Sequence, residues 1–420
     1  MYKFVIEGGK RLKGEVEISG AKNASLALIP ATLLANGEFK LYNTPDLRDI
    51  TTMSQLMRSI GAKIKLEKNT LTINTKKIKK FEAPYELVKK MRASIYVLGP
   101  LLGRYSQAKV SLPGGCAWGP RPVNLHIEGL KKLGASIDLQ EGYIIAKAKN
   151  LKGADITFDI SSVGATGNIL MAATLAKGET RIQNAAIEPE ITSLAEFLVK
   201  MGAKIEGIGT NQLLIQGVDE LRPTDFYTIP DRIETGTFLI AAAITKGNIK
   251  VINCNPQHCD ALLYKLKEVG CYIETGENWI KLMGPDTIKP VDVTTAIYPG
   301  FPTDMQAQWM ALMSVADGSS ILTETIYYDR FKHVPELIRL GANIDVNENV
   351  AVIKGVKKLK GAKVMSTDLR ASASLILAGL IAEGKTEVLR VYHLDRGYEK
   401  IENKLQKLGA NIKRKYYQEF

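Results

Sequence analysis

One cysteine of the chain lies in a segment whose composition could make its thiol reactive. Cys116 follows Pro113-Gly114-Gly115 and precedes Gly119-Pro120-Arg121-Pro122. Such a run of glycines and prolines is typical of a loop and not of a buried helix or strand. A neighbouring guanidinium favours the nucleophilic thiolate form of cysteine, and Arg121 can also bind an anion. The segment therefore predicts a reactive thiol beside an anion site.

Other side chains that could bind anions or move protons stand at the ends of predicted elements. Taken singly, an arginine in such a place is most often a surface charge. If the fold brings several together, their guanidinium groups bind phosphate and carboxylate bidentately. The candidates are Lys22, Asn23, Arg92, Asp304, Arg330, Arg370 and Arg396.

The overall charge also suggests an anionic partner. The chain has 56 lysines and arginines against 44 aspartates and glutamates, a net charge of +12. This excess suits either nucleic acid or a phosphorylated or carboxylated small molecule. Nucleic-acid binding requires a concentrated basic face, whereas here the lysines are scattered and aromatic residues make up 7% of the chain. We therefore expect small-molecule partners and no nucleic acid.

Two further motifs that suggest a ligand have a structural explanation. The segment Gly379–Thr386 matches a P-loop, but a phosphate-binding P-loop follows a strand and opens a helix, and this one follows an apolar helix. Cys254, His258 and Cys259 lack the second ligand pair that a zinc site needs. We expect neither a metal nor a cofactor.

Length and composition suggest where the protein acts. The first ten residues mix charged with apolar side chains where a signal peptide would have an apolar core. No stretch reaches the roughly 18 apolar residues of a membrane span. Four cysteines in 420 residues are too few for a disulfide framework. These features predict a cytoplasmic protein that does not enter a membrane.

A sixfold repeat organises the chain. The end of an amphipathic helix is followed each time by glycine, a small residue, any residue and isoleucine, about 70 residues apart, with the glycines at Gly61, Gly134, Gly202, Gly270, Gly341 and Gly409. Such a glycine caps a helix in the left-handed conformation, and the residues after it alternate like a strand. An alanine-rich helix with few polar positions precedes each amphipathic one and is expected to be buried.

The second repeat is the exception. It is about three residues longer than the others between its two helices, and the extra residues fall at positions 113–122. An insertion that interrupts an internal repeat is a place to expect function. The repeat therefore points to the same segment as the chemistry of Cys116.

These motifs, in this order, resemble the enolpyruvyl transferase family, and within it the members that act on UDP-N-acetylglucosamine. The resemblance runs over the whole chain and rests on the motifs at residues 19–24, 91–94, 113–117, 121–123, 162–166, 230–236, 302–306, 368–372 and 396–399. It implies an inside-out α/β barrel of two domains with three repeats each. By the resemblance, residues 22–229 form the domain that carries Cys116, and residues 1–21 with 230–420 form the domain that carries Asp304.

The resemblance also implies a reaction and roles. The enolpyruvyl group of phosphoenolpyruvate would be transferred to the 3-hydroxyl of UDP-N-acetylglucosamine by addition and elimination, with release of phosphate, in the first committed step of peptidoglycan synthesis. Cys116 would be the proton donor and covalent thiol, and Asp304 the base. Phosphoenolpyruvate would be bound by Lys22, Asn23, Arg121, Arg330, Arg370 and Arg396. The nucleotide sugar would be bound by Asn23, Arg92, Arg121, Pro122, Val123, Asn124, Leu125, Ser162, Val163, Gly164, Asp304 and Ile326.

Two other interpretations stay open at this point. A shikimate-3-phosphate enolpyruvyl transferase would share the fold but would not carry the Cys116 loop. A noncatalytic repeat scaffold that binds RNA would explain the net charge but not a lone cysteine between glycines and an arginine. For the enzyme we expect small-molecule substrates, a monomer, and no cofactor, nucleic acid or membrane partner.

Overall fold

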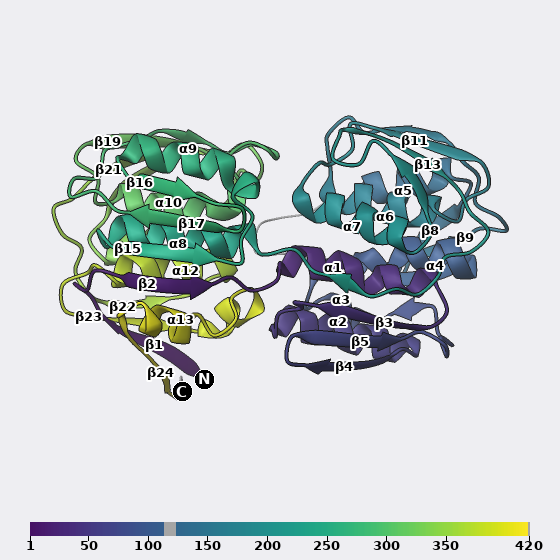
Figure 1. The fold of residues 1–420 in the computed structure, drawn as a ribbon, viewed down its shortest axis with the longest axis horizontal. Helices are drawn as coiled ribbons and strands as arrows, with labels where there is room; N and C mark the ends of the chain where they lie inside the picture. The colour runs from purple at the N-terminus through teal and green to yellow at the C-terminus, as the bar shows by residue number, and fades with distance from the viewer. Residues whose placement is uncertain (113–122, 419–420) are drawn as a thin grey trace. The chain divides into compact units, whose positions relative to one another are not determined.

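The computed structural model describes residues 1–112 and 123–418. The predicted site residues Cys116, Arg121 and Pro122 lie outside these ranges. The chain divides into two compact units, one formed by Met1–Ser19 with Pro230–Phe420 and the other by Gly20–Ile229. Each unit has three four-stranded sheets with helices between them (Figure 1).

The unit of residues 20–229 repeats one plan three times. Its sheets have the strand orders β14 (Phe226–Tyr227), β3 (Glu38–Tyr42), β5 (Thr70–Asn74), β4 (Lys63–Glu67); β6 (Glu82–Ala83), β7 (Gln107–Ser111), β9 (Tyr143–Lys147), β8 (Ser136–Gln140); and β10 (Asp155–Thr157), β11 (Glu179–Gln183), β13 (Gln212–Gln216), β12 (Lys204–Glu206). Its helices are α1 (Lys22–Ala31), η1 (Thr32–Leu34), α2 (Arg48–Ile60), α3 (Tyr85–Val88), η2 (Arg92–Val97), α4 (Leu98–Tyr105), α5 (Asn124–Lys132), α6 (Val163–Ala173) and α7 (Pro189–Lys200).

The other unit follows the same plan. Its sheets have the orders β16 (Tyr272–Thr275), β17 (Trp279–Met283), β15 (Asn248–Ile252), β2 (Lys13–Glu17); β18 (Val293–Thr294), β19 (Ser319–Thr323), β21 (Val350–Lys354), β20 (Asn343–Asn347); and β22 (Lys363–Met365), β23 (Lys385–Leu389), β1 (Tyr2–Glu7), β24 (Asn411–Tyr416). Its helices are α8 (Arg232–Ile244), η3 (Pro256–Cys259), α9 (Asp260–Val269), η4 (Thr303–Met305), α10 (Gln306–Met313), α11 (Val334–Arg339), α12 (Leu369–Gly379), η5 (Val391–Arg396) and α13 (Ile401–Lys407).

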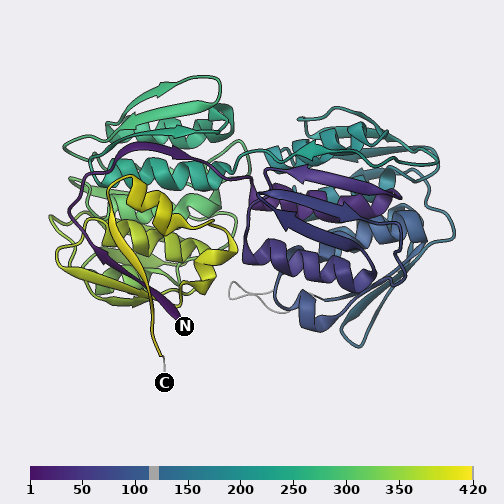
Figure 2. The same cartoon turned by 60° about the horizontal axis from the view of Figure 1, so that its bottom comes forward.

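Each sheet combines one parallel pair of strands with two antiparallel pairs. In the sheet of β18 to β21, β18 runs parallel to β19, and β19 pairs antiparallel with β21, which pairs antiparallel with β20. Three sheets complete this pattern with strands from distant parts of the chain. The strand β14 pairs with β3, β2 pairs with β15, and β1 lies between β23 and β24. Figure 2 shows β1 and the C-terminal strand side by side.

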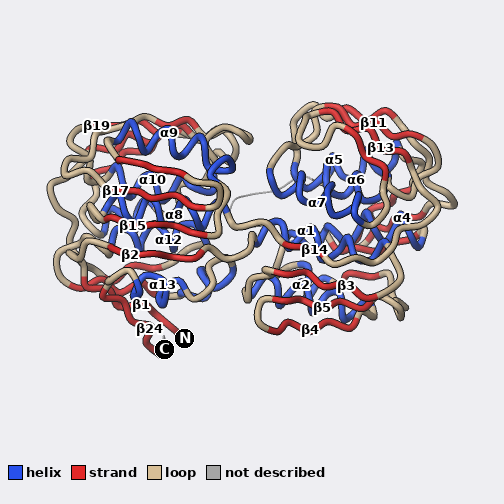
Figure 3. Tube along the Cα trace, in the orientation of Figure 1, coloured by secondary structure: helices blue, strands red, loops and turns tan. Residues whose placement is uncertain are grey.

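The alanine-rich helices form the centre of each unit, with the sheets outside them (Figure 3). All eight residues of α10 and all eleven of α12 are buried, as are all residues of α8 except Arg232. A helix that is apolar on every face is stable only when protein surrounds it on all sides. This arrangement confirms the inside-out α/β fold that the family resemblance implied.

The six repeat glycines end helices as predicted. Their φ angles lie between 92° and 121°, in the left-handed region that only glycine adopts without strain. The P-loop match at residues 379–386 joins the end of α12 to β23, and Gly384 has a φ of 85° in this connection. A strand therefore follows the glycine where a P-loop would open a helix.

Candidate active site

Asp304 lies between two buried arginines at the start of α10. The Arg330 Nη2 atom donates to Asp304 Oδ1 at 2.8 Å, and Arg370 donates to Oδ2 from Nη2 at 2.8 Å and from Nε at 3.1 Å. The arginine side chains are 9% and 4% exposed, whereas that of Asp304 is 28% exposed. Three predicted site residues are therefore together, with the carboxylate the most accessible of them.

The repeat shows what is unusual about Asp304. The helices α8 and α12 also begin after an aspartate, and in both cases that side chain caps the helix. Asp231 accepts from the backbone N–H groups of residues 233 and 234, and Asp368 accepts from those of residues 370 and 371. Asp304 instead lies inside η4, just before α10, and neither η4 nor α10 has a side-chain cap. Its carboxylate faces the guanidinium groups, so it is placed for chemistry and not for helix capping.

Arg370 belongs to a buried polar cluster at the centre of this unit. Burial alone would lower the pKa of Arg370, but the charge and hydrogen bond of Asp304, together with Tyr398 and Asp231, outweigh burial and raise it. The Arg370 guanidinium also lies 5.5 Å from the ring centroid of Tyr398. The Tyr398 hydroxyl pairs with Thr237 at 2.8 Å and accepts from Gln308 at 3.2 Å. The three core helices α8, α10 and α12 thus position this arginine jointly.

Arg396 lies at the end of η5, which is tied to the last strand. Arg414 of β24 forms a bidentate pair with Asp395, the neighbour of Arg396, at 2.7 and 3.0 Å. The same guanidinium donates to Glu402 of α13 at 2.7 Å. A doubly paired guanidinium fixes orientation as well as charge. This clamp therefore holds the turn that presents Arg396.

The predicted residues of the other unit lie at the starts of its helices. Lys22 and Asn23 open α1, and the Lys22 Nζ atom is 3.6 Å from the carboxylate of Asp49 on α2. Both side chains of this pair are largely buried, at 12% and 5% exposure. The Lys22 ammonium group is therefore held beside a carboxylate at the start of α1.

Four of the predicted nucleotide-binding positions lie near His126 in the chain or beside its ring. Asn124 and Leu125 precede it on α5. Gly164, in the first turn of α6, lies so close to the ring that an added Cβ would be 3.0 Å from the imidazole. The charge of Arg92 also acts on the ring. Ser162 caps α6, and Val163 accepts a hydrogen bond from the Tyr96 hydroxyl at 3.4 Å. His126 is not among the residues predicted from the sequence, because a lone histidine on an amphipathic helix gives no signal of a functional role.

The hydrogen bonds of Asn168 fix the tautomer of His126. The Asn168 carbonyl oxygen accepts from the backbone N–H of Gly99 at 2.7 Å, so its amide nitrogen must face His126 Nδ1, 2.9 Å away. Nδ1 therefore accepts, and the ring proton is on Nε2. Burial, followed by the charge of Arg92, lowers the pKa of His126 to about 3. The imidazole is neutral in the folded protein.

This neutral histidine predicts a loss of stability in acid. An unfolded imidazole, with its ordinary pKa of 6.5, takes up a proton before the folded one does. Stability is fully present above pH 6.5 and falls towards pH 3, by up to about 1.4 kcal/mol per pH unit. In chemical denaturation between pH 7 and 4, His126→Gln should show a shallower decline than the wild type. Parallel declines would contradict the prediction.

For two of the remaining predicted residues, the structure gives little more than their position in the chain. Val123 directly precedes α5, next to the residues outside the described ranges. Ile326 lies in the turn after β19, where its backbone N–H donates to Glu324 at 2.8 Å. Of the predicted residues, Asp304, Arg330 and Arg370 are in direct contact in one unit. In the other unit, the predicted residues lie at several helix starts, near Lys22 and near His126.

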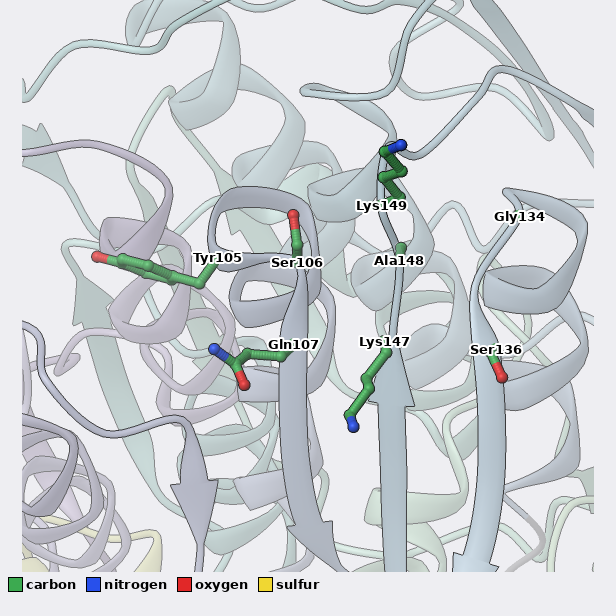
Figure 4. A pocket seen from close by; sticks show the side chains of 8 residues that line it. All are labelled: Tyr105, Ser106, Gln107, Gly134, Ser136, Lys147, Ala148 and Lys149. Atoms are coloured by element: carbon green, nitrogen blue, oxygen red, sulfur yellow. The ribbon is translucent and has the colours of Figure 1, made fainter.

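A separate surface pocket carries none of the predicted residues. Its volume is about 440 Å³, and it lies at the ends of β7, β8 and β9 (Figure 4). Tyr105, Ser106, Lys147 and Lys149 are among its lining residues. It offers no carboxylate, thiol or imidazole for catalysis. Within residues 1–112 and 123–418, no group of His, Cys, Asp or Glu could hold a metal ion, and no helix is long and apolar enough to cross a membrane.

Comparisons with known proteins agree with this geometry. The family model for EPSP synthase (3-phosphoshikimate 1-carboxyvinyltransferase) matches residues 6–405. A UDP-N-acetylglucosamine 1-carboxyvinyltransferase from Chloroherpeton thalassium is 62% identical, covering 100% of this chain and 99% of the relative. The enzyme of that name from Chlorobium chlorochromatii is 57% identical, with 100% of both chains covered.

Solved structures show the same architecture. The enolpyruvyl transferase NikO from Streptomyces tendae superposes with a TM-score of 0.90 at 26% identity, covering 99% of both chains. An EPSP synthase from Acinetobacter baumannii has a TM-score of 0.76 at 20% identity, covering 99% of this chain and 100% of that one. A match over nearly the whole chain, relatives of high identity and a shared fold lead to one conclusion. The chain belongs to the enolpyruvyl transferase family.

Proposed function

We propose that the protein transfers the enolpyruvyl group of phosphoenolpyruvate to the 3-hydroxyl of UDP-N-acetylglucosamine and releases phosphate, the first committed step of peptidoglycan synthesis. The observation that carries this proposal is the 62% identity, over the full length, to an enzyme named for this reaction. The shikimate enzyme among the solved structures is 20% identical, a level that supports the fold alone. An RNA-binding scaffold would have no use for a carboxylate held by two buried arginines.

The chemistry requires a base, an acid and fixed cations. We assign the base to Asp304, whose carboxylate takes the proton of the 3-hydroxyl as that oxygen bonds to C2 of phosphoenolpyruvate. Cys116 gives a proton to C3 and is the thiol that forms the covalent adduct. Loss of a proton from C3 then restores the double bond and expels phosphate. Arg330 and Arg370 are ready to stabilise the negative charge of the intermediate.

The binding residues follow the same proposal. Phosphoenolpyruvate is bound by Lys22, Asn23, Arg121, Arg330, Arg370 and Arg396. The nucleotide sugar is bound by Asn23, Arg92, residues 121–125, residues 162–164, Asp304 and Ile326. We take the two compact units as the two domains of the enzyme, and we place a monomer in the cytoplasm with these small molecules as its partners. The helix starts near Lys22, His126 and Asp304 support these positions, because helix N-termini favour anions.

A phosphate-release assay tests the function. The protein is incubated with phosphoenolpyruvate and either UDP-N-acetylglucosamine or shikimate 3-phosphate. We expect phosphate only with the nucleotide sugar, in equal amount to an enolpyruvyl product seen by mass spectrometry. Release with shikimate 3-phosphate alone would support the rival enzyme, and release with neither acceptor would contradict both.

The assignment of Cys116 predicts selective labelling. Cys254, Cys259 and Cys271 are buried, and burial raises the pKa of their thiols to about 11, 12 and 12. These thiols stay protonated and unreactive at neutral pH. An epoxide phosphonate, which resembles phosphate beside an electrophile, should therefore label Cys116 alone. Peptide mass mapping checks this, with Cys116→Ala as the unlabelled control, and a label on any buried cysteine would contradict it.

A further inference from the structure

We propose that Glu324, acting through the hydroxyl of Thr303, is a positioning residue that holds Arg330 against Asp304. This inference rests on the proposed function, since it concerns the base of that reaction. Glu324 follows β19 and is completely buried. A buried carboxylate is costly unless hydrogen bonds or a cation compensate for the lost water. Its surroundings therefore need an explanation.

Both carboxylate oxygens of Glu324 are occupied. Oε1 accepts from the Thr295 hydroxyl at 2.8 Å and from the backbone N–H groups of Ile326 at 2.8 Å and Tyr327 at 3.0 Å. Oε2 accepts from the Thr303 hydroxyl at 2.8 Å. All four donors are neutral groups. The positive charge that compensates Glu324 in this network is on Arg330, which is connected to Glu324 through the Thr303 hydroxyl.

The Thr303 hydroxyl has only one possible orientation. Its single proton points to Glu324, so its oxygen must accept, and Arg330 Nη1 donates to it at 2.8 Å. The other terminal nitrogen, Nη2, donates to Asp304 at 2.8 Å. The two ends of the guanidinium are thus fixed separately, one by the base and one by the threonine that Glu324 orients. Hydrogen bonds in such a chain polarise one another.

Glu324 also fixes the turn that delivers Arg330. Its bonds to the backbone of residues 326 and 327 order the start of the turn, and the Arg330 N–H donates to the carbonyl of Tyr327 at 3.1 Å. At the far end, Gln306 Nε2 donates to the Arg330 carbonyl at 3.2 Å. In this hydrogen-bond network Glu324 and Asp304 supply the carboxylates, and Arg330 and Arg370 supply the guanidinium groups. Loss of Glu324 would remove one of these two negative charges.

Thr295 provides a matched control for a purely structural role. It is buried and donates to the other oxygen of the same carboxylate, but its other hydroxyl hydrogen bonds are to the backbone of Thr323 and Thr325, away from Arg330. Thr295→Val and Thr303→Val each remove one hydroxyl donor from Glu324 with almost no change in shape. Only Thr303→Val breaks the connection to the arginine. Thr303 is half-buried, and thermal unfolding checks that its substitution leaves the protein folded.

The experiment compares kcat and KM of Thr303→Val, Thr303→Ser, Thr295→Val and Glu324→Gln in the phosphate-release assay, together with thermal unfolding. We expect Thr303→Val to lower kcat by about ten- to a hundredfold, the scale for a misplaced catalytic group, with the KM for the nucleotide sugar almost unchanged. Thr303→Ser, which keeps the hydroxyl, should restore kcat to within about threefold. Thr295→Val should lower the unfolding temperature but keep kcat to within about threefold.

A double variant tests whether Glu324 and Thr303 act together. If they form one path, Glu324→Gln with Thr303→Val should lower kcat no more than the worse single variant. Equal losses of kcat in Thr295→Val and Thr303→Val, or wild-type kcat in Thr303→Val, would overturn the inference while the wild type still turns over. A wild type that releases no phosphate would instead overturn the proposed function, and this inference with it.

Discussion

Asp304→Asn should lower turnover by about a hundredfold or more, the scale of a general base. The amide has the same shape and keeps one oxygen to accept from Arg330 or Arg370, but it cannot take a proton from the sugar hydroxyl. We therefore expect nearly all of the loss in kcat, with binding of UDP-N-acetylglucosamine weakened much less, because the amide can still form a hydrogen bond with the sugar hydroxyl. Steady-state phosphate release and calorimetric binding of the nucleotide sugar measure the two effects separately.

The repeat supplies the control for this variant. Asp368 also precedes a core helix, but it caps that helix through the N–H groups of residues 370 and 371. Asparagine caps helices about as well as aspartate, so Asp368→Asn should keep most of the turnover. Near-normal turnover in Asp304→Asn, or an equal loss in both variants, would rule out Asp304 as the base.

Lys22→Ala should weaken the binding of phosphoenolpyruvate more than the binding of the nucleotide sugar. Loss of one charge-assisted contact costs about 1.5–3 kcal/mol, or roughly ten- to a hundredfold in apparent affinity. Arg396→Ala should have a similar effect, because we assign it to the same phosphate. The measurement is the KM for phosphoenolpyruvate at saturating nucleotide sugar.

Exposed lysines distinguish a specific contact from the general positive field. Lys76 and Lys77 are exposed, and Asn74 accepts a hydrogen bond from the backbone of Lys76. Neutralising both removes two charges from the net +12 without touching the proposed site. We expect the KM to stay within about twofold of the wild type, since distant exposed charges are screened by salt. An effect as large as that of Lys22→Ala would favour the general field.

The fold could be predicted because its signals are local and repeated. The cap at Gly202, for example, requires a left-handed residue, and its φ is 109°. The glycines that follow the apolar, alanine-rich helices are less uniform in their backbone conformation. Gly178 and Gly384 are left-handed, but Gly247 is not; an added Cβ there would lie 2.4 Å from the carbonyl of Leu12. That glycine allows close approach of a strand from far away in the sequence, which no local pattern records.

The residues of the candidate site also fall into those that the sequence could identify and those that it could not. Asp304 and Arg370 stand in short motifs that indicate chemistry, and the structure brings them to within 2.8 Å. Glu324 follows an ordinary strand and His126 lies in an ordinary helix pattern, and their importance comes from burial and from partners up to 42 residues away. Such contacts arise from tertiary packing, so neither residue could be identified from its neighbours in sequence.

The place of β1 sets the order in which the chain can fold during synthesis. This strand lies between β23 and β24, so residues 2–7 stay without their partners until residues 385–416 have been made. The unit of residues 20–229 has no such dependence, because its sheets pair strands from within that range. It can fold on the ribosome while the rest is translated, since domains generally fold as units. The first residues to emerge are then among the last to reach their native partners.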